Sequence, residues 1–433
     1  MKYFGTDGIR GEYQGPVVNE DFAYSFGHAL NQYMNAPQGH AAKVLLGRDT
    51  RPSGQSLMSA LSMGLKNGGT QPIEAGVLPT PALAFGVING GFDLGVMITA
   101  SHNPSPDNGF KLFSKKGEKL AIHDEDFIES KLDRSLVLPI EEGLFAEKSN
   151  TLEGYIDRLM GFFPDNFLQG QKIVADLANG ATIATSAKVL AHFGAEVLSM
   201  HEGESVINED SGSEHPKLMQ EKVRQTGSHF GLAHDGDGDR VVFADEKGLL
   251  IHGDRVLGLL ALDAGNSSRL KGKGLVATEH SNSGLGESLR RHGFEFFRSP
   301  VGDRNVSALM KEKGCNLGGE SSGHVVSSDY LPTGDGLYTV LLVAHAMARS
   351  RKTLQELARA IILWPSKVGA IVVKEKIPLS SQPTLAKSLE EANLKLGQDG
   401  RILLRYSGTE PKIRLLVEGK QAELVTDIFC QPS

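Results

Sequence analysis

Short apolar runs alternate with amphipathic segments along the first third of the chain. Three of these runs have the length of a buried strand and stand at residues 43–47, 71–77 and 94–98. Between the first two, leucines recur every four residues, which predicts a helix over residues 56–66. Thr80-Pro81 predicts the start of a second helix. This strand-helix-strand-helix-strand order predicts a largely parallel sheet with helices on both faces.

The same alternation continues until the pattern changes near Trp364. Further strands are expected at residues 173–177, 196–200, 275–278 and 294–298, and helices at residues 151–163, 182–192, 217–224, 256–264, 285–291, 306–313, 337–347 and 354–363. Beyond residue 366, a half-exposed strand, a polar helix and a hairpin are expected. We therefore predict an α/β chain in which three similar α/β domains with mixed, largely parallel sheets, and a smaller carboxyl-terminal α+β domain, surround a central cleft. The predicted domains are residues 1–150, 151–252, 253–365 and 366–433.

Composition narrows the classes of function. The chain has 433 residues and a formal net charge of −7, which argues against a nucleic-acid partner. No uninterrupted apolar stretch reaches the roughly 18 residues of a membrane helix, so no membrane is expected either. Residues 1–11 lack an apolar signal region, and the only cysteines are Cys315 and Cys430. These features predict a cytoplasmic protein without a disulfide framework.

An acidic loop is the first candidate for chemistry. Asp235, Asp237 and Asp239 alternate with glycines and are followed by Arg240. Carboxylates at this spacing can converge on one hard cation such as Mg²⁺ or Ca²⁺. An EF-hand is excluded, because Arg240 stands where that motif needs glycine, and a strand pattern follows. An Asp-Gly turn that only caps backbone amides is the alternative, but the third aspartate and the arginine favour a metal site.

Ser101 is the second candidate. It follows the apolar run 94–98 and precedes Pro104, so it is expected in a turn at the carboxyl end of a strand, where open α/β sheets bind ligands. His102 could accept or orient a proton, and Lys111 offers a point charge for a phosphate. A serine-hydrolase site is disfavoured, because Ser101 lacks a Gly-x-Ser-x-Gly context. A surface serine in a proline turn is the alternative for this segment alone.

Two further loops carry groups that suit a sugar phosphate. Residues 319–324 place Glu320 and Ser322 on a glycine-rich turn, a mixed set of acceptors and donors for sugar hydroxyls. Residues 405–414 combine groups that suit phosphate oxygens: Arg405, Ser407, Gly408, Thr409 and Arg414. Each loop alone could be an ordinary turn. Neither a Walker A motif nor a Gly-x-Gly-x-x-Gly after a strand is present in the sequence, so a kinase or dehydrogenase is not expected.

These four loops, in this order, resemble the α-D-phosphohexomutase family over essentially the whole chain. They are similar to its phosphoserine, metal-binding, sugar-binding and phosphate-binding loops. Three segments resemble the branch of the family that acts on amino sugars: residues 3–11, 333–336 and 407–411. Asn305 departs from the family pattern, in which an aromatic residue is expected at this position.

The resemblance implies an isomerase that interconverts glucosamine 6-phosphate and glucosamine 1-phosphate through a 1,6-bisphosphate and feeds UDP-N-acetylglucosamine synthesis. The active form would carry a phosphoryl group on Ser101. One Mg²⁺ per chain would be bound by Ser101, Asp235, Asp237 and Asp239. Glucosamine 1,6-bisphosphate or a similar compound would act as the primer. A relative that acts on mannose or glucose phosphates is the alternative.

The resemblance also assigns expected roles to other residues. Beside the catalytic Ser101, the candidates for proton transfer are His102, Lys111, Arg10 and His324. The sugar is expected to contact Arg240, Asp303, Arg304, Glu320, Ser322 and His324. The phosphate that is not transferred is expected to bind Arg405, Ser407, Gly408, Thr409 and Arg414. The expected partner is a small-molecule sugar phosphate, and the chain is expected to be a monomer or a homodimer.

Overall fold

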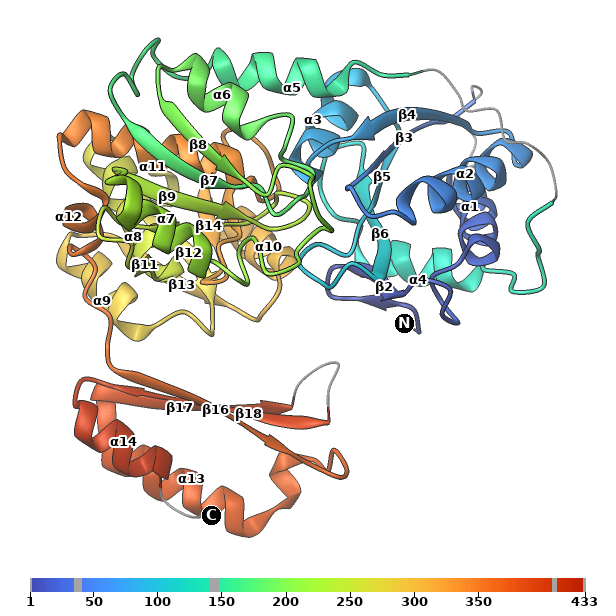
Figure 1. The fold of residues 1–433 in the computed structure, drawn as a ribbon. Helices are drawn as coiled ribbons and strands as arrows, with labels where there is room; N and C mark the ends of the chain where they lie inside the picture. The colour runs from blue at the N-terminus through green and yellow to red at the C-terminus, as the bar shows by residue number, and fades with distance from the viewer. Residues whose placement is uncertain (1, 35–40, 140–147, 407–410, 431–433) are drawn as a thin grey trace. The chain divides into compact units, whose positions relative to one another are not determined.

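The structure, a computed structural model, describes residues 2–34, 41–139, 148–406 and 411–430. It divides into two compact units, which comprise residues 1–280 with 296–359, and residues 281–295 with 360–433. The strands form three sheets of mixed direction and one smaller antiparallel sheet (Figure 1). This arrangement confirms the predicted fold class of three α/β domains followed by a smaller carboxyl-terminal α+β domain.

The first sheet has six strands, and the apolar run that precedes Ser101 is one of the central ones. In spatial order the strands are β1 (Phe4–Gly5), β2 (Gly8–Glu12), β6 (Asp107–Ser114), β5 (Leu94–Ile98), β3 (Lys43–Arg48) and β4 (Gln71–Val77). Strand β3 is parallel to β4 and β5, and the other pairs are antiparallel. All five residues of β5 are buried, as in strands that are covered on both faces.

Four helices accompany this sheet: α1 (Glu20–Met34), α2 (Gly54–Asn67), α3 (Thr80–Gly90) and α4 (Ile122–Ser130). Helices α1 and α2 pack side by side (Figure 1). Helix α3 comes very close to β5, because Gly95 has no side chain. A Cβ at Gly95 would lie 2.5 Å from Val87 Cγ2. Glycine at this position therefore lets the helix and the strand pack tightly.

The second sheet has five strands and carries the acidic loop. In spatial order they are β11 (Leu250–Ile251), β10 (Val241–Ala244), β9 (Phe230–His234), β7 (Lys172–Asp176) and β8 (Glu196–Met200). Strand β7 is parallel to β8 and β9, whereas β10 is antiparallel to β9 and β11. The helices are α5 (Thr151–Met160), α6 (Ser186–His192) and α7 (Lys217–Thr226). Strand β9 is fully buried and leads directly into Asp235.

The third sheet has four strands: β13 (Glu295–Ser299), β12 (Gly274–Thr278), β14 (Leu317–Gly319) and β15 (Val325–Ser327). Strands β12 and β14 are parallel, and β14 and β15 form an antiparallel hairpin around residues 320–324. The helical segments are α8 (Gly253–Asn266), η1 (Lys271–Lys273), α10 (Asp303–Lys313), α11 (Gly336–Ser350) and α12 (Leu354–Ala358).

The second unit is built on a three-stranded antiparallel sheet. Its strands are β16 (Ser366–Val372), β18 (Lys412–Gly419) and β17 (Gly400–Tyr406), in this spatial order. Its helical segments are α9 (Ser283–Arg291), η2 (Leu379–Ser381), α13 (Pro383–Leu396), η3 (Gly397–Asp399) and α14 (Ala422–Cys430). Helices α13 and α14 cover one face of the sheet (Figure 1). The amide of Ser283 and the guanidinium of Arg401 both donate to the buried Glu418, which ties α9 to this sheet.

The predicted elements agree with the structure to different degrees. Residues 94–98 form β5 as predicted, and the helix predicted over 56–66 is α2 with slightly wider bounds. The helix expected from residue 182 begins at Ser186, because residues 180–185 form turns. Helix α1 and strands β1 and β2 were not among the predicted elements.

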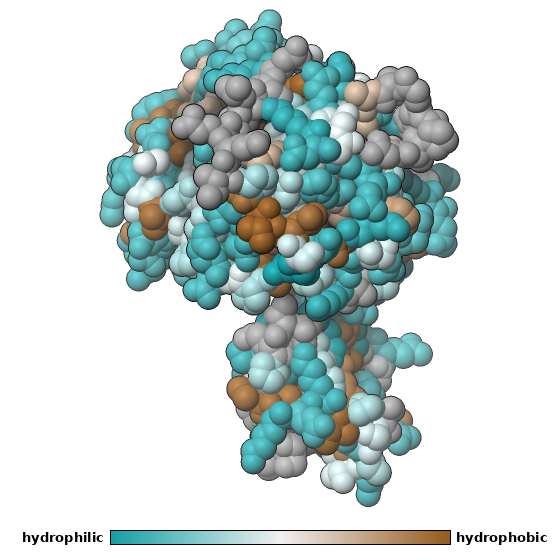
Figure 2. All heavy atoms as spheres, turned by 90° about the vertical axis from the view of Figure 1, so that its right-hand side faces the viewer, coloured by the Kyte–Doolittle hydropathy of each residue, from teal (hydrophilic) through white to brown (hydrophobic). Residues whose placement is uncertain are grey.

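On the face drawn in Figure 2, hydrophobic side chains form small separate patches among hydrophilic ones. Among the described residues, no helix combines the length and the apolar character that a membrane span requires.

Candidate active site

Three loops that follow buried strands meet in the first unit. Ser101 lies three residues beyond β5, and Asp235 and Glu320 directly follow β9 and β14. Ser101 Oγ donates a hydrogen bond to Asp235 Oδ2 at 2.7 Å, and Arg240 pairs with His324 through an antiparallel bridge. The loops that follow strands of three sheets therefore form one polar centre. The carboxyl ends of strands are where open α/β sheets bind ligands.

Ser101 has an uncommon backbone conformation. Its φ of +54° lies in the left-handed region, which residues other than glycine rarely occupy. The N–H of Ser101 donates to Thr99 Oγ1 at 2.8 Å, and the residue is fully buried. In addition to its hydrogen bond to Asp235, Oγ lies 3.3 Å from His102 Nδ1. A hydroxyl between an imidazole and a carboxylate, on a strained turn, is typical of a reactive oxygen.

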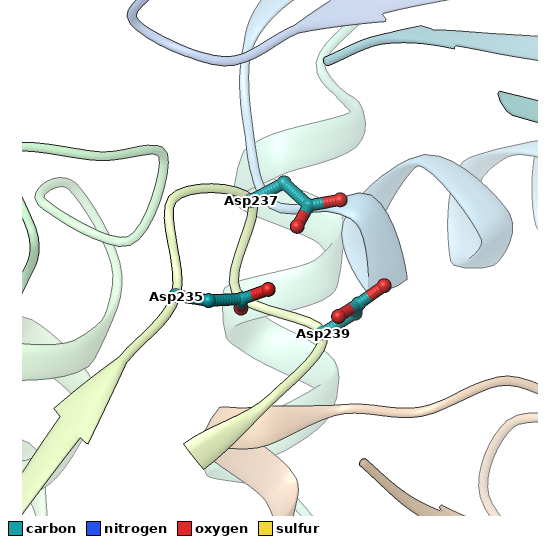
Figure 3. Close-up of side chains that lie close together, drawn as sticks. All are labelled: Asp235, Asp237 and Asp239. Carbon is teal, nitrogen blue, oxygen red and sulfur yellow. The ribbon is translucent and has the colours of Figure 1, made fainter. Parts of the chain in front are cut away.

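The three aspartates lie on the turn between β9 and β10 (Figure 3). One carboxylate oxygen from each lies within 4.8 Å of the others, and all three residues are buried. Gly238 has a φ of +72°, and a Cβ there would lie 2.5 Å from Thr182 Cγ2. The glycine is therefore needed for the tight turn that brings the carboxylates together.

This cluster fits a hard cation. Asp237 Oδ1 and Asp239 Oδ1 are buried and have no hydrogen-bond partner among the described residues, which is costly for carboxylate oxygens. Burial raises the pKa of Asp235 well above its usual value, and the charges of Asp239 and Asp237 raise it further. A divalent cation would reduce the repulsion among the three carboxylates and would bind to the oxygens that have no hydrogen-bond partner. A donor set made only of oxygens suits Mg²⁺.

Lys111, in strand β6 of the first sheet, forms ion pairs with two of the three aspartates. Its ammonium lies 2.7 Å from Asp237 Oδ2 and 2.7 Å from Asp239 Oδ2, and 3.3 Å from Asp7 Oδ2. Burial favours the neutral amine, but the carboxylates of Asp237, Asp239 and Asp7 outweigh it and raise the pKa of Lys111 well above its usual value. The same ammonium, with His324, keeps the pKa of Asp239 well below its usual value in spite of burial.

A closed ring of alternating charges runs through this site. Starting from Lys111, each side chain lies near the next in the order Asp7, Lys119, Asp303, His324, Asp239 and back to Lys111. The two nitrogens of His324 each lie 3.6 Å from an oxygen of Asp239 or Asp303. Burial favours the neutral imidazole, but Asp239 outweighs it and raises the pKa of His324. The ring links the first sheet, the acidic loop and helix α10.

The predicted sugar-binding residues lie at one edge of this ring. Glu320 Oε1 accepts a hydrogen bond from the amide of Gly302 at 3.1 Å, and Ser322 is exposed. Arg304 forms an ion pair with Glu125 of α4. A cavity of about 460 Å³ lies beside residues 118–122 and α10, and its lining includes Asp303, Arg304 and His324 but not Glu320, Ser322 or Arg240. This volume lies in the range of small-molecule sites.

Arg10 and Arg240, which were also predicted as site residues, lie near the acidic cluster. Arg10 pairs with Asp7, and its Nη1 donates to Asn103 Oδ1 at 3.4 Å. Arg240 lies beside Asp239, with 3.8 Å between Nε and Oδ1. Both guanidinium groups thus border the acidic centre. Asn305, the departure from the family pattern, donates to the carbonyl of Val301 at 2.8 Å.

The predicted phosphate-binding residues belong to the second unit. Arg405 near the end of β17 and Arg414 in β18 are register partners in the antiparallel pair. Residues directly opposite each other on such strands have adjacent side chains. The predicted residues Ser407, Gly408 and Thr409 lie outside the described residues.

Two charged residues of the site were not predicted from the sequence. Asp7 stands between Thr6 and Gly8, and its isolated carboxylate offers no spacing that points to a site. Lys119 follows a lysine-rich turn and cannot be told from a solvated surface lysine by sequence. Partial burial and ion pairing distinguish Asp7 and Lys119, and their ion-pair partners lie in segments that are distant in the sequence.

Comparison with known proteins identifies the family. Four models of the phosphoglucomutase/phosphomannomutase family match in order: alpha/beta/alpha domain I over residues 1–136, domain II over 153–248, domain III over 252–363, and the C-terminal domain over 370–431. The chain belongs to the phosphoglucomutase/phosphomannomutase family, and its predicted membership of the phosphohexomutases is confirmed.

Individual relatives give more detail than the family models. The chain is 39% identical over 429 residues to a phosphoglucosamine mutase of Coxiella burnetii, with 98% of this chain and 96% of the relative covered. A solved structure of a phosphoglucomutase/phosphomannomutase family protein from Burkholderia thailandensis matches with a TM-score of 0.80 at 24% identity, covering 98% of this chain and 95% of that one. The N-acetylphosphoglucosamine mutase of Aspergillus fumigatus, solved with GlcNAc-6P and magnesium, matches with a TM-score of 0.66 at 17% identity, covering 98% and 93%. The two solved structures support the fold.

Proposed function

We propose that this chain catalyses the phosphoglucosamine mutase reaction, the interconversion of glucosamine 6-phosphate and glucosamine 1-phosphate. The observation that carries the proposal is the hydrogen bond of 2.7 Å from Ser101 Oγ to Asp235 in the buried acidic cluster. A hydroxyl nucleophile beside an oxygen-only metal site is the arrangement that phosphoryl transfer needs. The 39% identity to a phosphoglucosamine mutase over nearly the full length supports the amino-sugar substrate.

The proposed cycle has two transfers. In the first, the bond between phosphorus and Ser101 Oγ breaks, a bond between phosphorus and O1 of glucosamine 6-phosphate forms, the O1 hydroxyl loses its proton, and Ser101 Oγ gains one. The resulting glucosamine 1,6-bisphosphate then reverses its orientation. In the second transfer, the bond between phosphorus and O6 breaks, a bond between phosphorus and Ser101 Oγ forms, Ser101 Oγ loses its proton and O6 gains one, which leaves glucosamine 1-phosphate. The enzyme returns to its phosphorylated form, so a bisphosphate is needed only as primer.

The residues of the acidic loop would hold the cation. Asp235, Asp237, Asp239 and an oxygen on Ser101 form a suitable set of ligands for one Mg²⁺. When bound, the cation would supply charge neutralisation for the transferring phosphoryl group. Lys111 forms ion pairs with Asp237 and Asp239, and would reduce the repulsion among the carboxylates when no cation is bound.

Proton transfer is best assigned to the histidines among the four candidates. Burial lowers the pKa of His102 to about 4, and Arg240 and Arg10 add to this shift, so its ring is neutral at pH 7 and can accept a proton. Lys111 is a poor proton acceptor because its pKa is raised, and arginine stays charged in proteins. We therefore propose His102 as the proton acceptor at Ser101, and His324, whose pKa is raised, as the proton donor on the sugar side.

The remaining roles concern substrate binding. We propose that Glu320 and Ser322 bind two sugar hydroxyls, and that Arg240, Asp303, Arg304 and His324 line the sugar site. We propose that the phosphate that is not transferred binds to Arg405, Ser407, Gly408, Thr409 and Arg414. Planar guanidinium groups and hydroxyls suit a phosphate in either orientation of the substrate. The division into domains 1–150, 151–252, 253–365 and 366–433 is part of the same proposal.

The test is a comparison of substrates. Purified protein with Mg²⁺ and a catalytic amount of glucose 1,6-bisphosphate is assayed with the 6-phosphates of glucosamine, glucose and mannose. We expect the highest kcat/KM for glucosamine 6-phosphate, and no turnover after Ser101→Ala. A preference for mannose or glucose phosphate would support the alternative activity of the family. No turnover of any of the three would overturn the assignment as a mutase.

A further inference from the structure

The carbonyl groups of the Ser101 loop converge on one buried guanidinium. Arg51, in the turn between β3 and α2, is fully buried. Its Nη1 donates to the carbonyls of Pro104 and Asp107 at 2.6 and 2.7 Å, and its Nη2 to those of Ser101 and Asn103 at 3.0 and 2.8 Å. Nε donates to Asp49 Oδ2 at 3.0 Å, so all five N–H groups of the guanidinium are used.

The same cluster also reaches the amide side of Ser101. Asp49 Oδ2, the oxygen that binds Arg51, accepts a hydrogen bond of 2.6 Å from Thr99 Oγ1. Thr99 Oγ1 in turn accepts the N–H of Ser101 at 2.8 Å. The N–H and the C=O of Ser101 are therefore both connected to Arg51, one directly and one through Asp49 and Thr99.

The loop between β8 and α7 also binds the carbonyl of Ser101. Asn208 Nδ2 donates to the carbonyl of Ser101 at 2.8 Å and to that of Asn103 at 2.9 Å. The carbonyl of Ser101 also abuts the acidic loop, since a Cβ added to Gly236 would lie 2.7 Å from it. The carbonyl of Ser101 thus fixes the distance between the serine loop and the aspartates.

We propose that Arg51 is a positioning residue for phosphoryl transfer, with Asn208 as its partner. A non-glycine residue keeps a left-handed conformation only where its surroundings over-determine it, and these contacts do so for Ser101. Arg51 thereby directs Oγ toward Asp235 without touching the substrate. This inference depends on the proposed role of Ser101 as the residue that carries the phosphoryl group.

The test uses Arg51→Lys and Asn208→Ala in the full-length protein. A lysine places its donors on one atom and cannot bridge four carbonyls in a plane. Because an error of about 1 Å in the reacting group costs on the order of a hundredfold, we expect a fall in kcat of about 10- to 100-fold for Arg51→Lys. We expect a smaller fall for Asn208→Ala, and a KM for glucosamine 6-phosphate within about twofold of the wild type for both, because neither residue contacts the sugar.

Two further readouts separate positioning from general damage. The rate at which glucose 1,6-bisphosphate phosphorylates Ser101, followed by intact mass, should fall in parallel with kcat. The affinity for Mg²⁺, measured by calorimetry, should fall much less than kcat, since the three aspartates among the four proposed ligands are intact. The control is Arg48→Lys, because Arg48 lies in the same part of the chain but donates to Gln55 and to the carbonyl of Asp49, and not to the serine loop.

The outcomes distinguish this inference from the proposed function. Wild-type kcat in both variants, or losses of Mg²⁺ affinity and KM as large as the loss in kcat, would overturn the positioning role. If Arg51→Lys does not fold, Asn208→Ala decides alone by the same criteria. A wild-type protein that neither turns over nor becomes phosphorylated at Ser101 would instead overturn the proposed function.

Discussion

Lys111 offers the most direct test of how the site stays folded without a cation. Its ammonium is buried and lies 2.7 Å from each of two aspartates and 3.3 Å from Asp7. Lys111→Met keeps the length of the side chain and removes the charge. The buried Asp237 and Asp239 and the half-buried Asp7 then lose a shared counter-charge, and loss of one partner of a buried ion pair costs about 3–5 kcal/mol.

That cost can be measured as a melting temperature. For domains of this size a change of 1 kcal/mol shifts Tm by roughly 2–4 °C, so Lys111→Met should lower Tm by about 6–20 °C in EDTA. Magnesium should raise the Tm of the variant by more than that of the wild type, because the cation supplies the missing positive charge to the aspartates. The measurement is thermal unfolding by circular dichroism in EDTA and in Mg²⁺.

The matched control is Lys311→Met. Lys311 pairs with Glu118 on the surface, and its side chain is 63% exposed, so its loss should cost less than about 1 kcal/mol. An unchanged Tm for Lys111→Met in EDTA would refute the reasoning about charge. An equal gain from magnesium in variant and wild type would refute the link between Lys111 and the metal site.

Three further predictions concern the metal loop and its supports. Asp237→Asn should lower Mg²⁺-dependent turnover by at least about a hundredfold and weaken Mg²⁺ binding in calorimetry, because one charged ligand is lost. Gly180→Ala should destabilise the protein by about 1–3 kcal/mol in urea unfolding, because a Cβ would lie 2.4 Å from the carbonyl of Gly236 in the metal loop. Burial raises the pKa of Asp335 to about 7, so the folded state binds a proton that the unfolded state releases between about pH 4 and pH 7. Stability should therefore fall over this range by at most about 4 kcal/mol, and Asp335→Asn should remove that fall in unfolding at several pH values.

The predictions for Gly180 and Asp335 each have a control. Asn in place of Asp335 can still accept the hydrogen bond from the amide of Tyr338 that caps α11, so the cap is retained. Gly154→Ala lies within α5, where a Cβ makes an ordinary contact of 3.5 Å, and should not destabilise. Full activity of Asp237→Asn, wild-type stability of Gly180→Ala, or an unchanged pH slope after Asp335→Asn would contradict the respective prediction.

The sequence predicted the parts of the site that are local in the chain. Ser101 and the three aspartates each follow a buried apolar run, and such a run marks the end of a strand in the sequence itself. The meeting of these loops was predicted only through the family resemblance. Their hydrogen bond at 2.7 Å joins residues that are 134 positions apart.

The residues that were missed act through distant partners. Lys119 is a site residue because Asp7 and Asp303 approach it, and Arg51 matters because four carbonyls of another loop point at it. The structure places Arg51 fully buried among carbonyl oxygens, which its sequence context does not predict. Composition and periodicity carry no information on such pairings.

The central claim is that Ser101 carries the phosphoryl group. Protein incubated with glucose 1,6-bisphosphate and Mg²⁺, then digested and analysed by mass spectrometry, should gain one phosphoryl group on the peptide that contains Ser101. Addition of excess glucosamine 6-phosphate should remove this group as glucosamine 1,6-bisphosphate appears. A phosphoryl group on another residue, or turnover by Ser101→Ala, would contradict the account.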